Sequence, residues 1–227
     1  MEVGREEEMG QLRRLLGYSQ ALYSGVEVDV LVRLALEEAL SVLPMDRMTI
    51  SLRETTTSPL RLAGVREGTR VITRGTDMVS PFAALEVQVI NQGMPVYVAD
   101  AAEGVRRLDD SLIRSIMAAP LKATSKRAEI FGVLVVGSRA PNLYSERDQR
   151  IFRELIGVTA AALSISLDTA RQRQAAAQDA LTNAIFAKLQ SVDSVEVLLT
   201  IYAQELGRAF GAESARATLL INERAVE

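Results

Sequence analysis

The sequence of 227 residues contains no cysteine, no histidine and no tryptophan. Without cysteine, the chain cannot form a disulfide, hold a metal through thiolates or use a thiol as a nucleophile. Without histidine, it lacks the usual base of a serine hydrolase, the usual axial ligand of haem and a histidine that accepts phosphate. Because these absences remove the commonest catalytic arrangements, we predict that the protein is not an enzyme.

The chain also lacks an excess of charge and a long hydrophobic run. It has 26 Lys and Arg residues against 29 Asp and Glu residues, so it shows no basic footprint for nucleic acid. The longest apolar stretch, Ile156 to Leu167, is far shorter than the roughly 20 residues that cross a bilayer. The acidic start of the chain is unlike a signal peptide. We therefore predict a soluble, cytoplasmic protein that binds neither membranes nor nucleic acid.

Two helices are predicted in the first 43 residues. Apolar residues recur at steps of three and four over residues 5–24, which is typical of a helix with one apolar face. A second helix is expected from Asp29, as its N-cap, to Leu43, because Pro44 then prevents it from continuing.

From Met48 onward the apolar residues alternate with polar ones, which is typical of half-buried strands. A short helix interrupts the strands, with Ser80 as its expected cap and Pro81 as its first residue. The segment from Ile130 to Val136 is apolar at nearly every position, so we expect a central strand that is covered on both faces. The expected strands are 48–53, 60–66, 70–74, 95–98, 115–124 and 129–139, and the expected helix between the third and the fourth is 82–91.

A long helix is expected from Ser145, its N-cap, to Leu189. No proline occurs after Pro141, and at 1.5 Å per residue such a helix would be roughly 65–70 Å long. A heptad stripe runs along it, typical of a coiled coil, and this stripe predicts a homodimer. The alternative is an amphipathic helix that packs on its own domain. The residues of the stripe are Ile156, Leu163, Leu167, Ala170, Gln174, Ala177, Leu181 and Ala184.

The C-terminal 40 residues repeat the order of elements at the beginning. With Leu31 aligned to Leu198, the helix, turn, helix and strand of the start recur, and Pro44 meets Gly211 where both second helices end. A repeated spacing of this kind predicts a second copy of the domain that covers only residues 191–227. The alternative is a chance similarity between two amphipathic segments.

Three stretches resemble the closing hairpin and helix of GAF domains: Ser115–Leu121, Phe131–Ser138 and Tyr144–Asp148. The resemblance implies an α/β (α+β) fold in which helices flank a central antiparallel sheet of about six strands, with long N- and C-terminal helices. The domains implied are an N-terminal dimerisation helix over 1–24, a GAF domain over 25–165, a linker helix over 166–190 and a partial GAF-like segment over 191–227.

The resemblance also bears on cofactors. Members that bind cyclic nucleotides carry the pattern N-K…F-x-x-x-D-E, for which this chain has Ser138, Arg139, Tyr144, Asp148 and Gln149. Only Asp148 matches, so cyclic-nucleotide binding is not expected. Covalent bilin attachment and methionine sulfoxide reduction need cysteine in this family, and haem binding needs histidine. We therefore expect no cofactor and no metal.

In GAF domains the ligand pocket lies between the sheet and the segments around the third strand and the short helices. On this sequence those segments are about 74–82 and 98–117. Arg106 and Arg107 are suited to hold an anionic ligand, although a solvated charged loop is the alternative. Phe82 is expected in the core rather than as a stacking platform. The candidate ligand-binding residues are Arg74, Asp77, Ser80, Phe82, Asp100, Arg106, Arg107 and Arg114.

The resemblance implies a sensory or regulatory module of a signal-transduction protein. Such a module would bind a small molecule or a partner and relay the change through the long dimeric helix. Its output would be a kinase of the histidine kinase type, a cyclase or a phosphatase. The alternative is a ligand-free dimerisation scaffold.

Overall fold

A computed structural model gives the arrangement of most of the N-terminal three quarters of the chain. The residues it describes are 10, 13, 16–20, 22, 27–55, 57–73, 79–102, 112–123, 129–190, 203, 204, 207 and 216. The chain divides into two compact units, Met1–Asp168 and Thr169–Glu227. The predicted second GAF copy over 191–227 lies outside the described residues, apart from four single positions.

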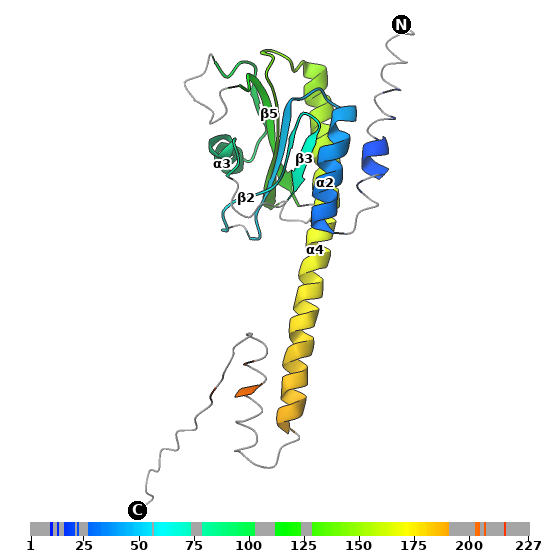
Figure 1. The fold of residues 1–227 in the computed structure, drawn as a ribbon, viewed down its shortest axis with the longest axis vertical. Coiled ribbons are helices and arrows are strands. Elements are labelled where there is room, and N and C mark those ends of the chain that lie inside the picture. Colours follow the sequence, from blue (N-terminus) through cyan, green and yellow to red (C-terminus); the bar gives the residue numbers. More distant parts are fainter. Residues whose placement is uncertain are drawn as a thin grey trace, which may run out of the picture. The chain divides into compact units, whose positions relative to one another are not determined.

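The first unit contains a six-stranded sheet with helices on both of its faces (Figure 1). The ends of each element lie within two residues of the predicted ends, except for those of the helix that was predicted at 29–43. The elements are α2 (Val28–Glu38), η1 (Ala39–Ser41), β1 (Arg47–Leu52), β2 (Arg61–Glu67), β3 (Arg70–Thr73), α3 (Ala83–Gln92), β4 (Val96–Val98), β5 (Ser115–Lys122), β6 (Ile130–Ser138) and α4 (Glu146–Gln190).

The strands follow the order β3-β2-β1-β6-β5-β4, and every neighbouring pair is antiparallel. The fold is therefore the α+β arrangement that the sequence predicted. β6 lies inside the sheet and is buried from Phe131 to Ser138, which confirms the prediction of a strand covered on both faces. Pro120 on β5 lies past Ala118, where the pairing with β4 ends, so its missing N–H removes no bond to β4.

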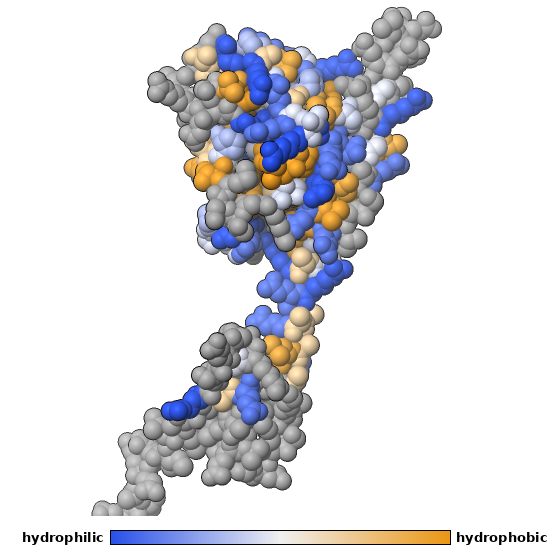
Figure 2. All heavy atoms as spheres, viewed as in Figure 1, coloured by the Kyte–Doolittle hydropathy of each residue, from blue (hydrophilic) through white to orange (hydrophobic). Residues whose placement is uncertain are grey.

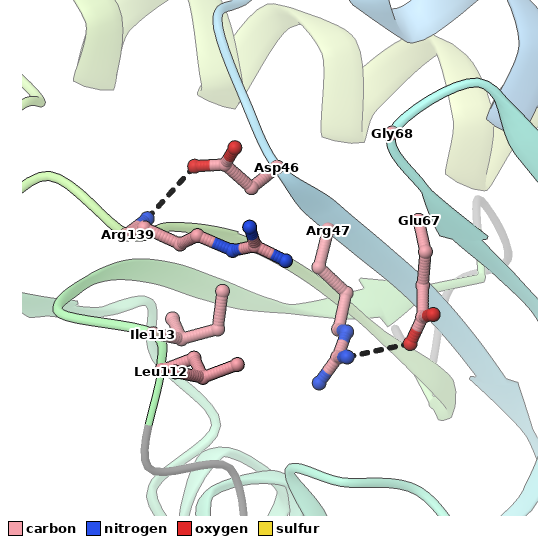
Figure 3. Close-up of a pocket in the computed structure, with 7 residues that line it drawn as sticks. All are labelled: Asp46, Arg47, Glu67, Gly68, Leu112, Ile113 and Arg139. Atoms are coloured by element: carbon pink, nitrogen blue, oxygen red, sulfur yellow. Dashed lines mark hydrogen bonds and ion pairs between the residues drawn. The ribbon is translucent and has the colours of Figure 1, made fainter.

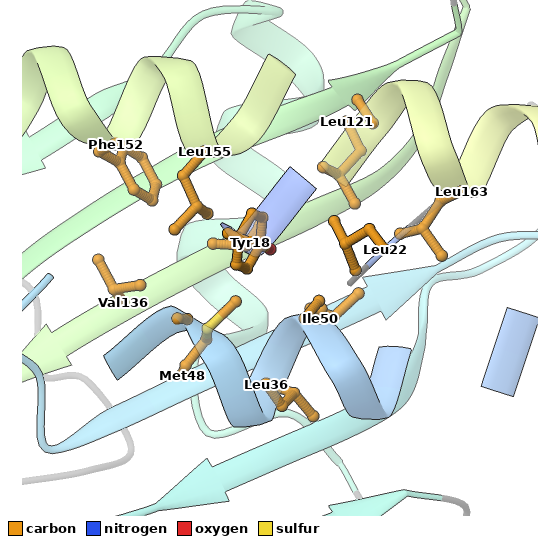
Figure 4. Packing of buried hydrophobic residues seen from close by; sticks show 14 of the residues in the cluster. Tyr18, Leu22, Leu36, Met48, Ile50, Leu121, Val136, Phe152, Leu155 and Leu163 are labelled. Atoms are coloured by element: carbon orange, nitrogen blue, oxygen red, sulfur yellow. The ribbon is translucent and has the colours of Figure 1, made fainter. Parts of the chain in front are cut away.

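The two faces of the sheet are covered by different helices. Figure 4 shows Met48 and Ile50 of β1 and Val136 of β6 packed toward α2 and α4. The opposite face carries Val133 and Val135 of β6, which pack with α3. Neighbouring residues of one strand thus contribute to separate apolar clusters, as the alternation of side chains in a strand requires.

Gly132 is needed where β6 passes β1. A Cβ atom at this position would lie 2.5 Å from the carbonyl oxygen of Ser51 and 2.8 Å from Leu52 Cδ2. Because a backbone oxygen cannot move away as a flexible side chain can, only glycine fits there. Gly132 therefore permits the close approach of β6 to β1.

Part of the N-terminal segment packs on the same core. Residues 16–20 are helical, and Tyr18 and Leu22 are buried in the cluster beneath α2 and α4, whereas Leu16 is exposed. The Tyr18 hydroxyl lies 2.6 Å from Thr159 Oγ1, which itself donates to the carbonyl of Leu155. Tyr18 is therefore the donor of this bond. Burial raises the pKa of the Tyr18 hydroxyl, because the charged form would lose its contact with water.

The predicted start and end of the helix at 29–43 were wrong. Glu27 precedes the first turn of α2, and Asp29 lies inside that turn, where a carboxylate complements the helix dipole. The α-helix ends at Glu38 and continues as one turn of 3₁₀ helix, η1. The hydroxyl of Ser41 donates to the carbonyl of Glu38 at 2.7 Å, which satisfies one of the carbonyls left at the helix end.

The predicted start of the helix at Ser80-Pro81 also differs. α3 begins at Ala83, and Ser80 and Pro81 form a turn in front of it. In that turn, Ser80 Oγ accepts from the Phe82 N–H at 3.2 Å, and its carbonyl accepts from the Ala83 N–H at 3.1 Å. Ser80 thus satisfies an N–H just before the helix, but it is not the N-cap.

The predicted N-cap of the long helix is confirmed. Ser145 Oγ accepts from the Asp148 N–H at 3.3 Å, and Asp148 Oδ2 accepts from the Ser145 N–H at 2.9 Å. These reciprocal bonds form a capping box that fixes the first turn. The helix then continues without a break to Gln190, one residue beyond the predicted end.

Candidate functional site

The face of the sheet beneath α3 contains buried polar side chains. Met48 and Ile50 of β1 point toward α2 and α4, so Thr49 and Ser51 point to the other side. Their partners across the ladder are Val135 and Val133 of β6, respectively, which belong to the apolar cluster under α3. Polar groups are therefore enclosed in apolar surroundings on this face.

A buried carboxyl group links α3 to β1. Glu86 of α3 is 2% exposed, and its Oε1 atom accepts from Ser80 Oγ at 2.6 Å and from Ser51 Oγ at 2.8 Å. Burial raises the pKa of Glu86, and the two serine hydroxyls partly oppose this rise. The contact joins α3 and the turn in front of it to β1, which lies 35 residues before Glu86 at Ser51.

Thr49 lies on the same face of β1 as Ser51 and has no such partner. It is 0% exposed, and among the described residues its Oγ1 atom finds no hydrogen-bond partner. A buried hydroxyl without a partner destabilises a fold by roughly 1–3 kcal/mol, so it is uncommon in native structures.

An open hollow of about 210 Å³ lies on the α3 face where β1 begins and β6 ends (Figure 3). Arg47 is paired with Gly137 in the ladder, which brings the start of β1 beside the residues that follow β6. The side chain of Ile113 is 4% exposed and that of Leu112 is 60% exposed. The lining residues are Asp46, Arg47, Glu67, Gly68, Leu112, Ile113 and Arg139.

Two pairs of opposite charges border this hollow. Arg47 Nη2 lies 2.5 Å from Glu67 Oε1. Asp46 Oδ2 accepts from the Arg139 N–H and from Ser138 Oγ, each at 2.8 Å. The bond from Arg139 is the largest cause that lowers the pKa of Asp46, so this carboxylate is ionised at neutral pH. Figure 3 shows the Arg139 guanidinium extending toward Arg47.

Four of the eight predicted site residues are described. Ser80 contacts Glu86, as above. Phe82 is 1% exposed and lies in the apolar cluster under α3, which is the core position that was expected for it. Asp100 and Arg114 form a bidentate ion pair, with 2.7 Å between Arg114 Nε and Asp100 Oδ1. This pair lowers the pKa of Asp100 to about 2.

The other four predicted residues lie outside the described residues; these are Arg74, Asp77, Arg106 and Arg107. Sequence reasoning missed Thr49, Ser51, Glu86 and the charged residues of the hollow. One signal was available for Glu86, because it lies four residues after Phe82 and three before Val89, on the apolar stripe of its helix. A carboxylate on such a stripe indicates a buried polar contact.

Comparison with known proteins agrees with this architecture. Residues 25–164, more than half of the chain, match the GAF domain family. The chain belongs to the GAF domain family. GAF domains are a sensory and signalling fold, and usually regulatory. No curated protein matches the chain.

Several solved GAF structures share the fold. The GAF domain of an Acinetobacter phosphoenolpyruvate-protein phosphotransferase has a TM-score of 0.54 and 19% identity, over 72% of this chain and 96% of that one. The free methionine-R-sulfoxide reductase of Neisseria meningitidis, solved with its substrate, has a TM-score of 0.55 and 19% identity, over 72% and 91%. Part of a methyl-accepting chemotaxis protein has a TM-score of 0.51 and 15% identity, over 67% and 97%. At these identities the likeness shows the fold alone, and one of these proteins is an enzyme, a reductase.

Among the described segments, no helix is both long and apolar enough to cross a membrane.

Proposed function

We propose that this chain is a non-catalytic sensory GAF module of a signal-transduction protein. It binds a small molecule on the α3 face of its sheet and passes the change to an output domain, such as a kinase, a cyclase or a phosphatase, through α4 in a parallel homodimer. The continuity of α4 is the observation that carries this proposal. One helix of 45 residues is buried in the GAF core at Phe152, Leu155 and Leu163, whereas every side chain from Ala170 to Ala184 is exposed.

The heptad stripe supports a dimer through the second part of α4. Leu163 is used by the core of its own domain, but Ala170, Ala177, Leu181 and Ala184 continue the stripe along the exposed stretch. Figure 2 shows this stretch as a mixture of hydrophilic and hydrophobic surface. An apolar stripe in water is stabilised when a second helix covers it. The stripe is rich in alanine and is interrupted by Gln174, so its register is weakly specified and a small free energy can shift it.

The short segment between β6 and α4 supports the proposed route of the signal from the sheet to the long helix. β6 ends at Ser138 and α4 begins at Glu146, so the connecting segment is short. Arg139, the first residue of that segment, lines the hollow and is tied to Asp46 through its backbone N–H. A ligand in the hollow would therefore contact the segment that sets the position of the first turn of α4. Such a ligand shifts the helix only if it binds two arrangements with different affinity.

One observation favours the alternative of a ligand-free dimerisation scaffold. Phe82 is 1% exposed and packs in the apolar cluster between α3 and the sheet, so its ring occupies part of the face to which the ligand is assigned. A dimer through α4 is common to both proposals, and only the first requires a ligand to change it.

Cysteine cross-linking tests the dimer, because the natural chain has no cysteine that would interfere. Gln174→Cys and Leu181→Cys lie on the heptad stripe, whereas Gln172→Cys and Asp179→Cys lie on the opposite side of the same exposed helix. In a parallel pair, stripe positions come within the Cα separation of about 4.4–6.8 Å that a disulfide needs. We expect oxidation to give disulfide-linked dimers for the two stripe variants and monomers for the two control variants.

Equal cross-linking at all four positions, or a monomer in sedimentation equilibrium at high concentration, would contradict the dimer. A cross-linking pattern that no small molecule alters would favour the scaffold over the sensor.

A further inference from the structure

We propose that Tyr144 is a two-position hydrogen-bond switch in front of α4, whose hydroxyl donates either to Asp46 beside the sheet or to Asp148 in the helix. The first bond ties the start of α4 to the sheet, and the second releases it. This inference rests on the proposed function, because it names a residue that regulates the relay from the sheet to α4. The observation that carries it is a buried hydroxyl that bonds to neither carboxylate in this arrangement.

The first part of the segment between β6 and α4 is held by the sheet. Ser115 Oγ donates to the carbonyl of Ala140 at 2.7 Å, and the Asn142 N–H donates to the carbonyl of Ala99 at 2.8 Å. Asn142 has a φ of 53°, in the left-handed region that asparagine tolerates. Tyr144 follows these bonds and directly precedes the capping box of α4, so it lies at the junction between the held segment and the helix.

The hydroxyl of Tyr144 is enclosed without a partner. The side chain packs against the apolar cluster beneath α2 and α4. Its oxygen atom is buried and forms no hydrogen bond with any described residue. An unpaired buried hydroxyl destabilises a fold and is uncommon in native structures. A small movement that gives this hydroxyl an acceptor is therefore favourable.

Two carboxylates lie near this hydroxyl. Asp46 directs its carboxylate toward Tyr144, and Figure 3 shows that carboxylate on the side of β1 that faces α4, away from Leu112. Burial is the main cause that raises the pKa of Tyr144, and the charges of Asp46 and Asp148 raise it further, because they oppose a negative phenolate. Both carboxylates therefore act on the same phenol.

Each of the two carboxylates has one oxygen atom available. Asp46 accepts both of its hydrogen bonds through Oδ2, and Asp148 accepts from the backbone N–H and the hydroxyl of Ser145 through Oδ2 as well. Neither Oδ1 atom accepts a hydrogen bond from the part of the chain that the structure describes. Since the Tyr144 hydroxyl carries a single proton, it can donate to only one of them at a time.

The two possible bonds have different consequences for α4. Asp46 directly precedes β1 and is bonded to the end of β6, so a bond from Tyr144 to Asp46 joins the helix start to the sheet. Asp148 belongs to the capping box, so a bond from Tyr144 to Asp148 stays within the start of the helix. A ligand that binds one arrangement more tightly shifts the population of the two and thereby the position of α4.

The carboxyl pKa values of the full chain, measured by NMR titration of labelled aspartate, test this inference. A hydroxyl that donates to a carboxylate stabilises its ionised form and lowers its pKa. If Tyr144 divides its hydrogen bond between two acceptors, Tyr144→Phe raises the pKa of both Asp46 and Asp148, each by about 0.3 pH units or more. Tyr97→Phe is the matched control at a tyrosine that is 38% exposed on β4, and it should leave both values unchanged.

A second variant tests whether the two acceptors compete. Asp148→Asn weakens the acceptor in the helix, so the hydroxyl of Tyr144 moves toward Asp46 and lowers the pKa of Asp46. Loss of the negative charge at position 148 lowers that pKa as well, but it does so with or without the hydroxyl. We therefore expect Asp148→Asn to lower the pKa of Asp46 more in the natural chain than in Tyr144→Phe.

Three results would overturn the inference. A pKa that rises at only one aspartate in Tyr144→Phe would show a single fixed bond, and no rise at either would show a hydroxyl that stays unpaired. An equal effect of Asp148→Asn with and without the hydroxyl would show that the acceptors do not compete. These titrations need neither a ligand nor a dimer, whereas cross-linking of Gln174→Cys and Leu181→Cys judges the dimer, so a failure of the switch is distinguished from a failure of the proposed sensor.

Discussion

The two faces of the sheet differ in what they enclose, although the same strands form both. β1 turns Met48 and Ile50 toward α2 and α4, where they join a large cluster of apolar side chains. The same strand turns Thr49 and Ser51 toward α3, where a carboxyl group and a hydroxyl that has no partner among the described residues are buried beside a smaller cluster. The first face therefore supplies most of the stability, and the second holds the groups that could recognise a ligand.

The charged hollow belongs to the second face. Arg47 lies two residues before Thr49 on β1, so its side chain points to the same side of the sheet. The polar side chains on the α3 face do not improve packing. Those that are buried lower the stability of the fold unless they form hydrogen bonds. Their concentration on one face is what a binding surface requires.

Replacement of Phe152 is the strongest test of this division. Phe152 of α4 is fully buried in the cluster beneath α2 and α4. We expect Phe152→Ala to lower the free energy of unfolding by about 3–5 kcal/mol, because it removes a buried ring and leaves a cavity. Urea unfolding measures this. Val87→Ala, at a position of α3 that is 57% exposed, is the control and should change the value by less than about 0.5 kcal/mol.

A loss below about 1 kcal/mol in Phe152→Ala would mean that the large cluster does not dominate the stability, and the contrast between the faces would fail.

The carboxyl group of Glu86 gives a second test, with an intermediate effect. Glu86→Gln keeps an acceptor for Ser51 and Ser80, whereas Glu86→Leu leaves both buried hydroxyls without their partner. We expect Glu86→Leu to be about 1–3 kcal/mol less stable than Glu86→Gln in urea unfolding. Equal stability of the two variants would show that the serines find other partners.

The pH dependence of the same group has a definite sign. Because burial raises the pKa of Glu86 in the folded state, the folded chain keeps a proton that the unfolded chain releases above about pH 4.3. The folded state therefore binds more protons in that range, and the unfolding free energy falls as the pH rises through the raised pKa. Glu86→Gln cannot titrate, so the stability of the natural chain relative to this variant should decrease from about pH 4 upward. A constant difference between the two would contradict the raised pKa.

Local sequence patterns were sufficient for most of the fold. The apolar run of β6 and the cap at Ser145 each depend only on residues that are close in the sequence. The start of α2 was placed wrongly, because Asp29 is as suitable in a first turn as at an N-cap.

The candidate site was less accessible to sequence analysis, because its residues meet only through tertiary packing. Ser51 and Glu86 are 35 positions apart and meet because α3 packs across β1. Asp46 and Arg139 are 93 positions apart and meet because β1 and β6 are antiparallel neighbours. The eight ligand-binding residues that the GAF resemblance suggested were placed mainly in loops. Four of them lie outside the described residues.

Thr49 provides the smallest expected effect and the most direct test of the α3 face. Its hydroxyl is fully buried, and among the described residues it has no hydrogen-bond partner. Thr49→Val has nearly the same shape and lacks the hydroxyl, so it removes the desolvation cost of a group that makes no bond to the described part of the chain. We expect the unfolding free energy to rise by about 1 kcal/mol in urea unfolding.

The matched control is Ser51→Ala, on the same face of the same strand, which removes a hydroxyl that does bond to Glu86 and should lower the stability by about 1 kcal/mol. If the unfolding free energy rises in Thr49→Val and falls in Ser51→Ala, stability alone does not explain the polar groups under α3. A loss of stability in Thr49→Val would instead reveal a partner for Thr49 in the folded chain, and the polar face would then be a satisfied part of the core.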